Sequence, residues 1–279
     1  MPKTMKKRLG TGLFYLSVTL LAVVTLLPFA WMLSSSFKSA ETIRTLPIRW
    51  IPEHPSLEGY RQVFQMTSFS FPRAAFNSLF LALMCTAVSV VSASMAAFIF
   101  AKVPFKGSGK LFGLFLATMM IPGTVTMVPN YIILRYLHLL DTFTGLILPS
   151  LSNAFGVFLM RQFYLGIPNE LSEAARIDGL SEYGIWARIV LPLAKPAIAT
   201  LCIFTFVNTW NDYMGPLIYL TSDLNKTIQV GLRRFIQAYT ADYNLIMAAS
   251  LCSLIPVTIV FLFLQRYFIE GIATTGLKG

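Results

Sequence analysis

The residues with the most distinctive types and spacing form one polar segment in the second half of the chain. It holds two acidic residues, two alanines and a glycine, followed by an isoleucine, a leucine and a proline: Glu173, Ala174, Ala175, Asp178, Gly179, Ile189, Leu191 and Pro192. The small alanines permit close approach to another protein, and Glu173 and Arg176 offer charges that could orient it. The segment predicts a docking surface. The alternative is a solvated linker with helical propensity.

The first part of this segment carries the signals of a short helix. Asn169 can cap a helix over residues 170–178, and negative charge at Glu170 and Glu173 in its first turn suits the helix dipole. Gly179 suits the left-handed position that follows a helix.

A second helix is expected over residues 182–191. Ser181 can cap its start, and Pro192 would end it. The segment is therefore expected to form a helix-glycine-helix element.

A second group of polar residues lies in an otherwise apolar stretch and consists of Asn208, Trp210, Asn211, Asp212 and Tyr213. Amides can pair with hydroxyl groups and aromatic faces can stack on sugar rings, so this group is a candidate translocation path for a sugar. The alternative is structural. Asp212 would then pack helices or break one, and Trp210 and Tyr213 would belong to an aromatic belt at a membrane interface.

The chain lacks the residues for chemistry of its own. The nearest approach to a phosphate-binding loop, residues 107–110, has Pro104 at the position of the first glycine and Leu111 at that of the magnesium-binding hydroxyl. The apolar stretches also lack the carboxylates and histidines of a proton relay. We therefore expect no catalytic residues and no ATP hydrolysis by this chain.

Metal and disulfide chemistry have no support either. Cys85, Cys202 and Cys252 all fall in apolar stretches, where free cysteine behaves as a small hydrophobe. His54 and His138 have no partner at ligand spacing. No metal site and no cofactor are expected.

The elements that must position these residues are membrane spans. Of the 279 residues, 56% are hydrophobic and 12% are charged, roughly half the charged share of an ordinary soluble domain. Six stretches are long enough to cross a hydrocarbon layer of about 30 Å, and Asp212 is the one Asp, Glu, Lys or Arg within them. The sequence predicts an all-α membrane protein with spans near residues 12–33, 78–100, 111–134, 143–160, 197–220 and 246–264.

The distribution of basic residues predicts the orientation. With a cytoplasmic N-terminus, the inner segments carry 13 of the 22 lysines and arginines, and the bias is strongest close to the helix ends. Both termini and the 161–196 loop are then cytoplasmic. Residues 12–33 exceed the ~7–15-residue apolar region of a signal peptide, so we expect them to remain as the first span. The net charge of +10 fits this topology and anionic lipid better than nucleic acid.

The spacing EAA-x3-G-x9-I-x-L-P resembles the coupling-loop signature of ABC importer permeases, the membrane subunits of transporters driven by separate ATPase subunits. All seven signature positions match, from Glu173 to Pro192. The resemblance implies that a short cytoplasmic helix inserts into a cleft of the ATPase, which binds the ATP, and that this contact rocks the spans between inward-open and outward-open states.

Other segments are similar to the carbohydrate, maltose-transporter branch of these permeases: residues 47–64, 208–217 and 268–279. The resemblance covers nearly the whole chain. It implies import of a mono- or oligosaccharide through a bacterial or archaeal cytoplasmic membrane, with a second permease subunit in a heterodimer, two ATPase subunits and an extracytoplasmic solute-binding protein. The outer loop 221–245 would reach toward the binding protein. The tail would contact the ATPases through Gly276, Leu277, Lys278 and Gly279.

The expected organisation is therefore a cytoplasmic segment 1–11, a six-helix permease domain 12–266 with the coupling loop at 168–192, and a cytoplasmic tail 267–279. Two other functions stay open. One is a permease for a non-sugar polar solute such as glycerol phosphate, and the other is a freestanding channel or secondary carrier.

Overall fold

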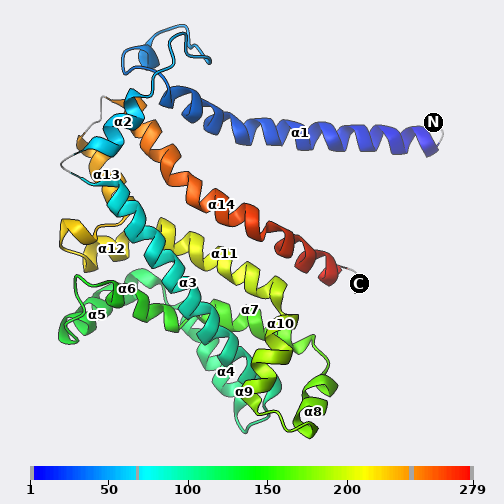
Figure 1. The fold of residues 1–279 in the computed structure, drawn as a ribbon. Helices are drawn as coiled ribbons and strands as arrows, with labels where there is room; N and C mark the ends of the chain where they lie inside the picture. The colour runs from blue at the N-terminus through cyan, green and yellow to red at the C-terminus, as the bar shows by residue number, and fades with distance from the viewer. Residues whose placement is uncertain (1–2, 67–68, 239–241, 277–279) are drawn as a thin grey trace. The chain divides into compact units, whose positions relative to one another are not determined.

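The structure is a computed structural model that describes residues 3–66, 69–238 and 242–276, and its regular elements there are all helical (Figure 1). The chain forms two units, Met1–Phe71 with Leu232–Leu254, and Pro72–Gly231 with Ile255–Gly279. The main helices are α1 (Lys3–Ser36), α2 (Glu58–Gln65), α3 (Phe71–Lys102), α4 (Ser108–Ala117), α5 (Gly123–Tyr136), α6 (Phe143–Ile147), α7 (Ala154–Leu165), α8 (Asn169–Ile177), α9 (Glu182–Ile185), α10 (Leu191–Leu193), α11 (Lys195–Asn211), α12 (Met214–Tyr219), α13 (Ile228–Ala238) and α14 (Tyr243–Gly276).

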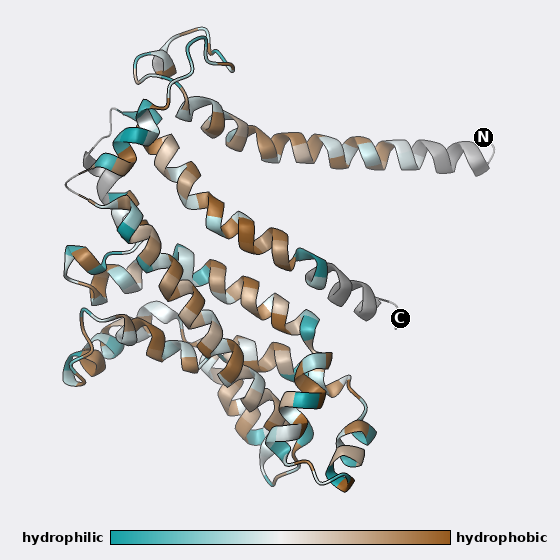
Figure 2. Ribbon diagram, in the orientation of Figure 1, coloured by the Kyte–Doolittle hydropathy of each residue, from teal (hydrophilic) through white to brown (hydrophobic). Residues whose placement is uncertain are grey.

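The membrane-spanning character of the fold follows from helix length and hydropathy. Four helical stretches in the described residues are long and apolar enough to cross a bilayer: Gly10–Ser36, Phe71–Lys102, Phe143–Leu165 and Tyr243–Tyr267. Two further helix pairs pass the same test with a bend between their members, 97° for Ser108–Met120 with Gly123–Tyr136 and 84° for Glu182–Leu193 with Lys195–Asn211. Hydrophobic residues colour most of α1, α3 and α14 (Figure 2). The all-α architecture with up to six spans confirms the expected fold class.

Two of the predicted spans are broken. In the third span the helix ends at Met120, and α5 starts again at Gly123 after Pro122. A proline has no N–H for the preceding turn and restricts the residue before it, so the chain turns there.

The prediction of one continuous fifth span over 197–220 is wrong. Helix α11 ends at Asn211, Asp212 adopts an extended conformation, and α12 is a separate short helix. The helical segment before α11, Glu182–Leu193, is the one that together with α11 is long and apolar enough to form a bent span.

The core of the second unit lies where α3, α4, α7, α8 and α11 meet the segment 182–194. Fifteen buried residues form it, including Ala93, Tyr164, Ala175, Ile185 and Leu201. A Cβ at Gly156 would lie 3.0 Å from both Ala93 Cβ and Leu201 Cδ1, so the small residues let α3, α7 and α11 approach closely.

Candidate functional site

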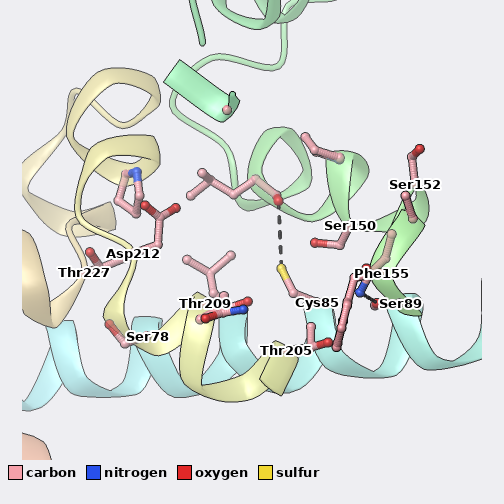
Figure 3. A pocket seen from close by; sticks show the side chains of 18 of the residues that line it. Ser78, Cys85, Ser89, Ser150, Ser152, Phe155, Thr205, Thr209, Asp212 and Thr227 are labelled. Atoms are coloured by element: carbon pink, nitrogen blue, oxygen red, sulfur yellow. Dashed lines mark hydrogen bonds between the residues drawn. The ribbon is translucent and has the colours of Figure 1, made fainter. Parts of the chain in front are cut away.

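A cavity of about 790 Å³, lined by both polar and apolar side chains, lies in the second unit (Figure 3). It is lined by α3, by the break between α4 and α5, by the α6–α7 connection, and by α11 and α12 with the segment that follows. Most of its polar lining consists of neutral hydroxyl and amide groups: Ser78, Ser89, Ser150, Ser152, Asn153, Thr205, Asn208, Thr209 and Thr227. Asp212 is the one charged residue among the lining residues. Such a surface can exchange hydrogen bonds with a hydroxyl-rich solute.

Helix α11 presents one polar face to this cavity. Thr205, Asn208, Thr209 and Asp212 follow helical spacing, and all four line the cavity. Of the five predicted path residues, the structure brings only Asn208 and Asp212 to the cavity wall. The sequence analysis missed Thr205 and Thr209, although the three- and four-residue spacing from Asn208 and Asp212 could have identified them.

The other three predicted path residues lie elsewhere. Trp210 is 2% exposed and stacks on Phe206 at 6.1 Å between ring centroids, so it is a packing residue rather than part of an interfacial belt. Asn211 is exposed, and its Oδ1 accepts a hydrogen bond of 3.4 Å from Gln229 Nε2. Tyr213 is half-buried and is not among the residues that line the cavity.

Asp212 combines the two roles considered for it. Its Oδ1 accepts the backbone N–H of Gly215 at 3.2 Å, which caps the restart of the chain into α12. A Cβ at position 215 would lie 2.6 Å from Asp212 Oδ2, so the cap needs a glycine there. The same residue lines the cavity, which makes it both the helix-break group and part of the wall.

On α3 and α7, a second polar contact crosses the cavity wall. Asn153 Nδ2 donates to Ser89 Oγ at 2.7 Å, and Asn153 Oδ1 accepts from the Gly156 N–H that opens α7. Neither residue was singled out from the sequence, because lone serines and asparagines are common near membrane helix ends.

The segment that follows α12 is fastened by Asp141. Its Oδ1 accepts from the N–H groups of Thr221 at 2.9 Å and Ser222 at 3.0 Å and from Ser222 Oγ at 3.0 Å, while its backbone oxygen accepts from Asn225 Nδ2 at 2.8 Å. Burial acts to raise the pKa of the Asp141 carboxyl, but the hydrogen bonds from Ser222, Thr221 and Asn225 outweigh it, so the pKa lies below its ordinary value. We call residues 141 and 219–225 the Asp141 clasp.

The polar segment forms the expected pair of helices, but the first helix begins at Asn169, one residue earlier than predicted. Gly179 has φ of +81° and follows α8, and Ser181 Oγ accepts the Gly184 N–H at 3.2 Å, which confirms both expectations. The prediction for Asn169 is wrong, because it is the first helical residue and makes no capping hydrogen bond. Its Oδ1 instead accepts from Lys102 Nζ at 2.7 Å.

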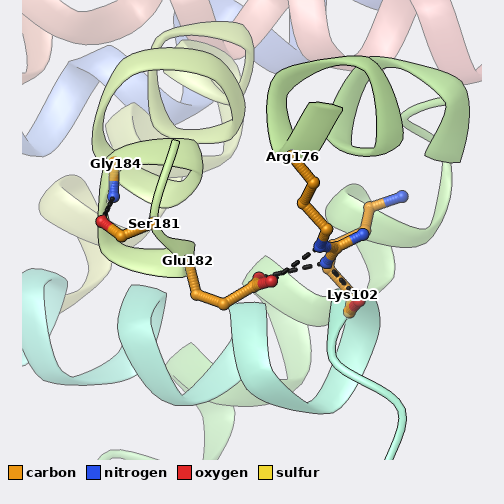
Figure 4. Close-up of polar contacts among 5 residues, drawn as sticks. All are labelled: Lys102, Arg176, Ser181, Glu182 and Gly184. Carbon is orange, nitrogen blue, oxygen red and sulfur yellow. Dashed lines mark hydrogen bonds and ion pairs between the residues drawn. The ribbon is translucent and has the colours of Figure 1, made fainter. Parts of the chain in front are cut away.

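Two cations hold α8 against the rest of the second unit, and Figure 4 shows the contacts of one of them, Arg176, with Glu182 and the backbone of Lys102. At its start, the buried Lys102 at the end of α3 donates to Asn169 Oδ1 and to the Ile167 carbonyl. At its end, Arg176 pairs with Glu182 at 2.6 and 3.0 Å and reaches the Lys102 carbonyl at 3.4 Å. Arg176 is therefore engaged within the chain, although its sequence suggested a contact with a partner. Lys102 was not predicted.

The signature residues of this segment differ in how far their side chains are exposed. Glu173, Ala174, Asp178 and Gly179 are exposed, whereas Ala175 is 5% exposed and belongs to the core. Ile189 and Leu191 are partly buried and pack against the same core. On the outer face, Leu171 and Ile177 are 44% and 87% exposed and flank Ala174. An outer face of α8 with apolar and acidic groups, fixed by a buried inner face, is suited to contact another protein.

The second helix of the element continues past its predicted end. Residues 186–190 form a π-helical turn, the Leu191 N–H reaches the Trp186 carbonyl, and helix extends to Leu193. Pro192 has no N–H to donate, and the wider turn before it keeps the helix going. The sharp bend follows at Ala194 instead.

The predicted ATPase-contacting tail is largely outside the description. Gly276 is the last residue of α14, and Leu277, Lys278 and Gly279 lie outside the described residues.

Bent spans around a polar cavity, with a helix-glycine-helix element on an adjoining loop, define a membrane-embedded transport subunit. The chain belongs to the family described as binding-protein-dependent transport system inner membrane component, which matches residues 41–274. It is a multi-pass, non-catalytic permease subunit of a binding-protein-dependent ABC importer in the inner membrane.

Its relatives include oligosaccharide permeases. The chain is 37% identical over 273 residues to the arabinooligosaccharides transport system permease protein AraQ of Bacillus subtilis, covering 98% of this chain and 96% of that protein. It is 32% identical over 290 residues to the polygalacturonan/rhamnogalacturonan transport system permease protein YtcP of the same organism, covering 99% and 100%. The fold matches a crystal structure of a bacterial ABC transporter involved in alginate import with a TM-score of 0.83 at 24% identity, covering 94% and 98% of the two chains.

Proposed function

We propose that this permease imports a sugar, a mono- or oligosaccharide, by alternating access through the cavity described above. The observation that carries the proposal is the lining of that cavity. A volume near 790 Å³ is within the range of about 300–1,000 Å³ of small-ligand sites, and neutral hydroxyl and amide groups come from several helices. The arabinooligosaccharide and polygalacturonan systems among the relatives support the same substrate class.

The proposed coupling surface is the outer face of α8. Glu173, Ala174 and Asp178 are exposed there beside the exposed Leu171 and Ile177, and Gly179 ends the helix. Ala175, Ile189 and Leu191 would contribute by holding that face in place rather than by touching the ATPase. Pro192 is exposed and remains part of the proposed coupling segment. An ATP-driven movement of the partner would then act on a helix that is already fastened to the spans.

The proposed assembly contains a second permease, two ATPases and an extracytoplasmic binding protein. In this arrangement residues 1–11 and 267–279 are cytoplasmic, and 12–266 is the permease domain with the coupling loop at 168–192. The tail from Gly276 to Gly279 is a proposed second contact with the ATPases. Its deletion is expected to abolish transport-linked ATP hydrolysis, and a deletion variant with normal coupled activity would remove that role.

The function is tested by reconstitution. The partners are recovered by mild-detergent co-purification with mass spectrometry, and the recovered binding protein is tested against a glycan panel. Labelled ligand is then offered to liposomes that contain either the assembled importer with ATP or this chain alone. We expect uptake of a glycan by the assembled importer only.

The alternatives predict other outcomes. Uptake through this chain alone would identify a channel or carrier. A binding protein that recognises glycerol phosphate and no glycan would leave the ABC importer class intact and overturn the sugar assignment.

A further inference from the structure

In the first unit, the connection after α1 folds back against α1 itself. The rings of Trp50 and Trp31 meet edge to face at 5.4 Å between centroids, and Ser34 Oγ donates to the Trp50 carbonyl. Trp50 also borders an open apolar cavity of about 380 Å³ whose other walls come from one side of α1: Val23, Leu26, Leu27 and Ala30. The residue thus lies beside the membrane-spanning part of α1.

The position along α1 gives the depth of this contact. The apolar stretch of α1 runs over Gly10–Ser36, so Val23 is at its middle and Ala30 is in its second half. At 1.5 Å per residue, Ala30 lies about 9 Å below the end of the helix at Ser36. With the cytoplasmic N-terminus proposed above, Trp50 would lie at the depth of the outer leaflet.

The residues around Trp50 expose apolar side chains. Leu46 is 85% exposed, Ile48 58% and Ile51 83%, and Trp50 itself is 47% exposed. The side chains of residues 10–30 in α1 are all exposed, so the exposed residues of the connection extend an apolar surface that is already present. Exposed apolar surface of this kind needs a covering medium.

Two backbone carbonyls of this connection accept hydrogen bonds from side chains. Lys38 Nζ donates to the Arg49 carbonyl at 2.5 Å, and Ser34 donates to the next carbonyl, that of Trp50. Lys38 is 4% exposed, and its Nζ lies 4.1 Å from the centre of the Trp31 ring. Irregular backbone is tolerated near hydrocarbon only when its polar groups have partners, and these two carbonyls have them.

Two charged side chains of the connection are exposed and pair with each other. Arg49 and Glu53 form an ion pair, and their side chains are 55% and 64% exposed. Charged heads that remain in water while neighbouring apolar side chains enter the acyl region are typical of interfacial segments.

We propose that residues 46–51 form an interfacial wedge that inserts into the outer leaflet of the bilayer, with lipid acyl chains against Leu46, Ile48 and Ile51 and in the cavity behind Trp50. We infer lipid rather than a protein partner as the occupant, because the wedge continues the exposed apolar surface of α1 at the same depth. This inference concerns the membrane contact and does not depend on which solute is imported.

The test is site-directed spin labelling of the assembled importer in liposomes. Cys85, Cys202 and Cys252 are first replaced by alanine or serine, and cysteine-free partner subunits are used. A nitroxide is attached at Ile51→Cys, with His54→Cys as the matched control three residues further along the same connection and Leu21→Cys as the control within α1. Both control sites are exposed, as is Ile51. Collision rates with oxygen, which partitions into lipid, and with a water-soluble nickel complex are compared.

We expect the ratio of oxygen to nickel collisions at Ile51→Cys to exceed that at His54→Cys several-fold and to approach that at Leu21→Cys. Leu46→Cys serves as a second wedge site if Ile51→Cys does not assemble. Equal ratios at positions 51 and 54 would place the wedge in water and overturn the proposal. An immobile label shielded from both reagents would show that a protein partner covers it, which would overturn the proposal equally.

Discussion

Single residues decide where helices stop and restart in this permease. Gly179 supplies the left-handed backbone that separates α8 from α9, and Asp212 caps the restart of the chain into α12. The sequence identified Gly179 and Ser181 correctly because glycine and serine have strong local preferences at helix ends. The sequence did not indicate the contacts of Asn169 and Trp210. Asn169 bonds Lys102, which is distant along the chain, and Trp210 stacks on Phe206, which precedes it by about one turn of α11.

Replacing Gly179 by alanine is expected to weaken coupling while the spans stay folded. A left-handed backbone costs a residue with a Cβ about 1–2 kcal/mol, and no heavy atom lies within 4 Å of the added methyl, so the effect is on backbone strain alone. Gly184→Ala is the control, because Gly184 is helical and the contacts of its added Cβ are at 3.5 Å or longer. Binding-protein-stimulated ATPase activity is the measurement. Equal activity of the two variants would contradict the prediction.

Replacing Asp141 by alanine is expected to destabilise the Asp141 clasp by about 1–3 kcal/mol, since the N–H groups of Thr221 and Ser222 lose their acceptor. The folded-state pKa of Asp141 is lowered, so the carboxylate contributes stability above its unfolded pKa of about 3.9, and the contribution is lost as the pH falls through the folded value. The melting temperatures of wild type and Asp141→Ala should differ at pH 5–8 and converge below about pH 4. A difference that vanishes already at neutral pH would refute this.

At the scale of helices, α8 is an amphipathic helix whose two faces have different neighbours. The inner face contacts the core through Ala175, and the ends are held by Lys102 and by the Arg176–Glu182 pair. The predicted helix over 170–178 agrees with α8 to within a residue at each end. Ala174 and Ala175 were expected to share one environment, but adjacent residues on a helix point in different directions, and only Ala175 is buried.

Lys102 is expected to be needed for the fixed position of α8. In Lys102→Met the stem is retained, but Asn169 Oδ1 and the Ile167 carbonyl lose their donor, which should cost about 1–3 kcal/mol. Lys106→Met removes an exposed cation from the turn between α3 and α4 and is the control. Hydrogen exchange of the α8 amides in the assembled importer is the readout. Unchanged protection in Lys102→Met would show that packing alone holds the helix.

The polar face of α11 gives a matched pair of asparagines. Asn208 lines the cavity, whereas Asn211 is not among the lining residues and accepts a hydrogen bond from Gln229. If Asn208 bonds the solute, Asn208→Ala should raise the KM for uptake about fivefold, the equivalent of one net hydrogen bond of about 1 kcal/mol, while Asn211→Ala should leave KM unchanged. The opposite pattern in liposome uptake would remove α11 from the path.

At the scale of the whole molecule, composition was sufficient for the fold class. An apolar share of 56% with few charges leaves little alternative to membrane helices, and the seven spaced signature residues pointed to the family. The breaks in the third and fifth spans could not be predicted from hydropathy, because the turns at Pro122 and Asp212 lie in stretches whose average hydropathy stays high. The cavity was also beyond the sequence, since its walls come from helices far apart in the chain.

Helix α3 runs without a break from Phe71 to Lys102, so a movement at one end is transmitted to the other. At its C-terminal end Lys102 binds the start of α8, and further along the same helix Ser89, Cys85 and Ser78 line the cavity. The 25 residues from Ser78 to Lys102 form a continuous helix with a length of about 36 Å. A partner protein that moves α8 would therefore also move α3. A tilt of α3 by only a few degrees would change the width of the cavity.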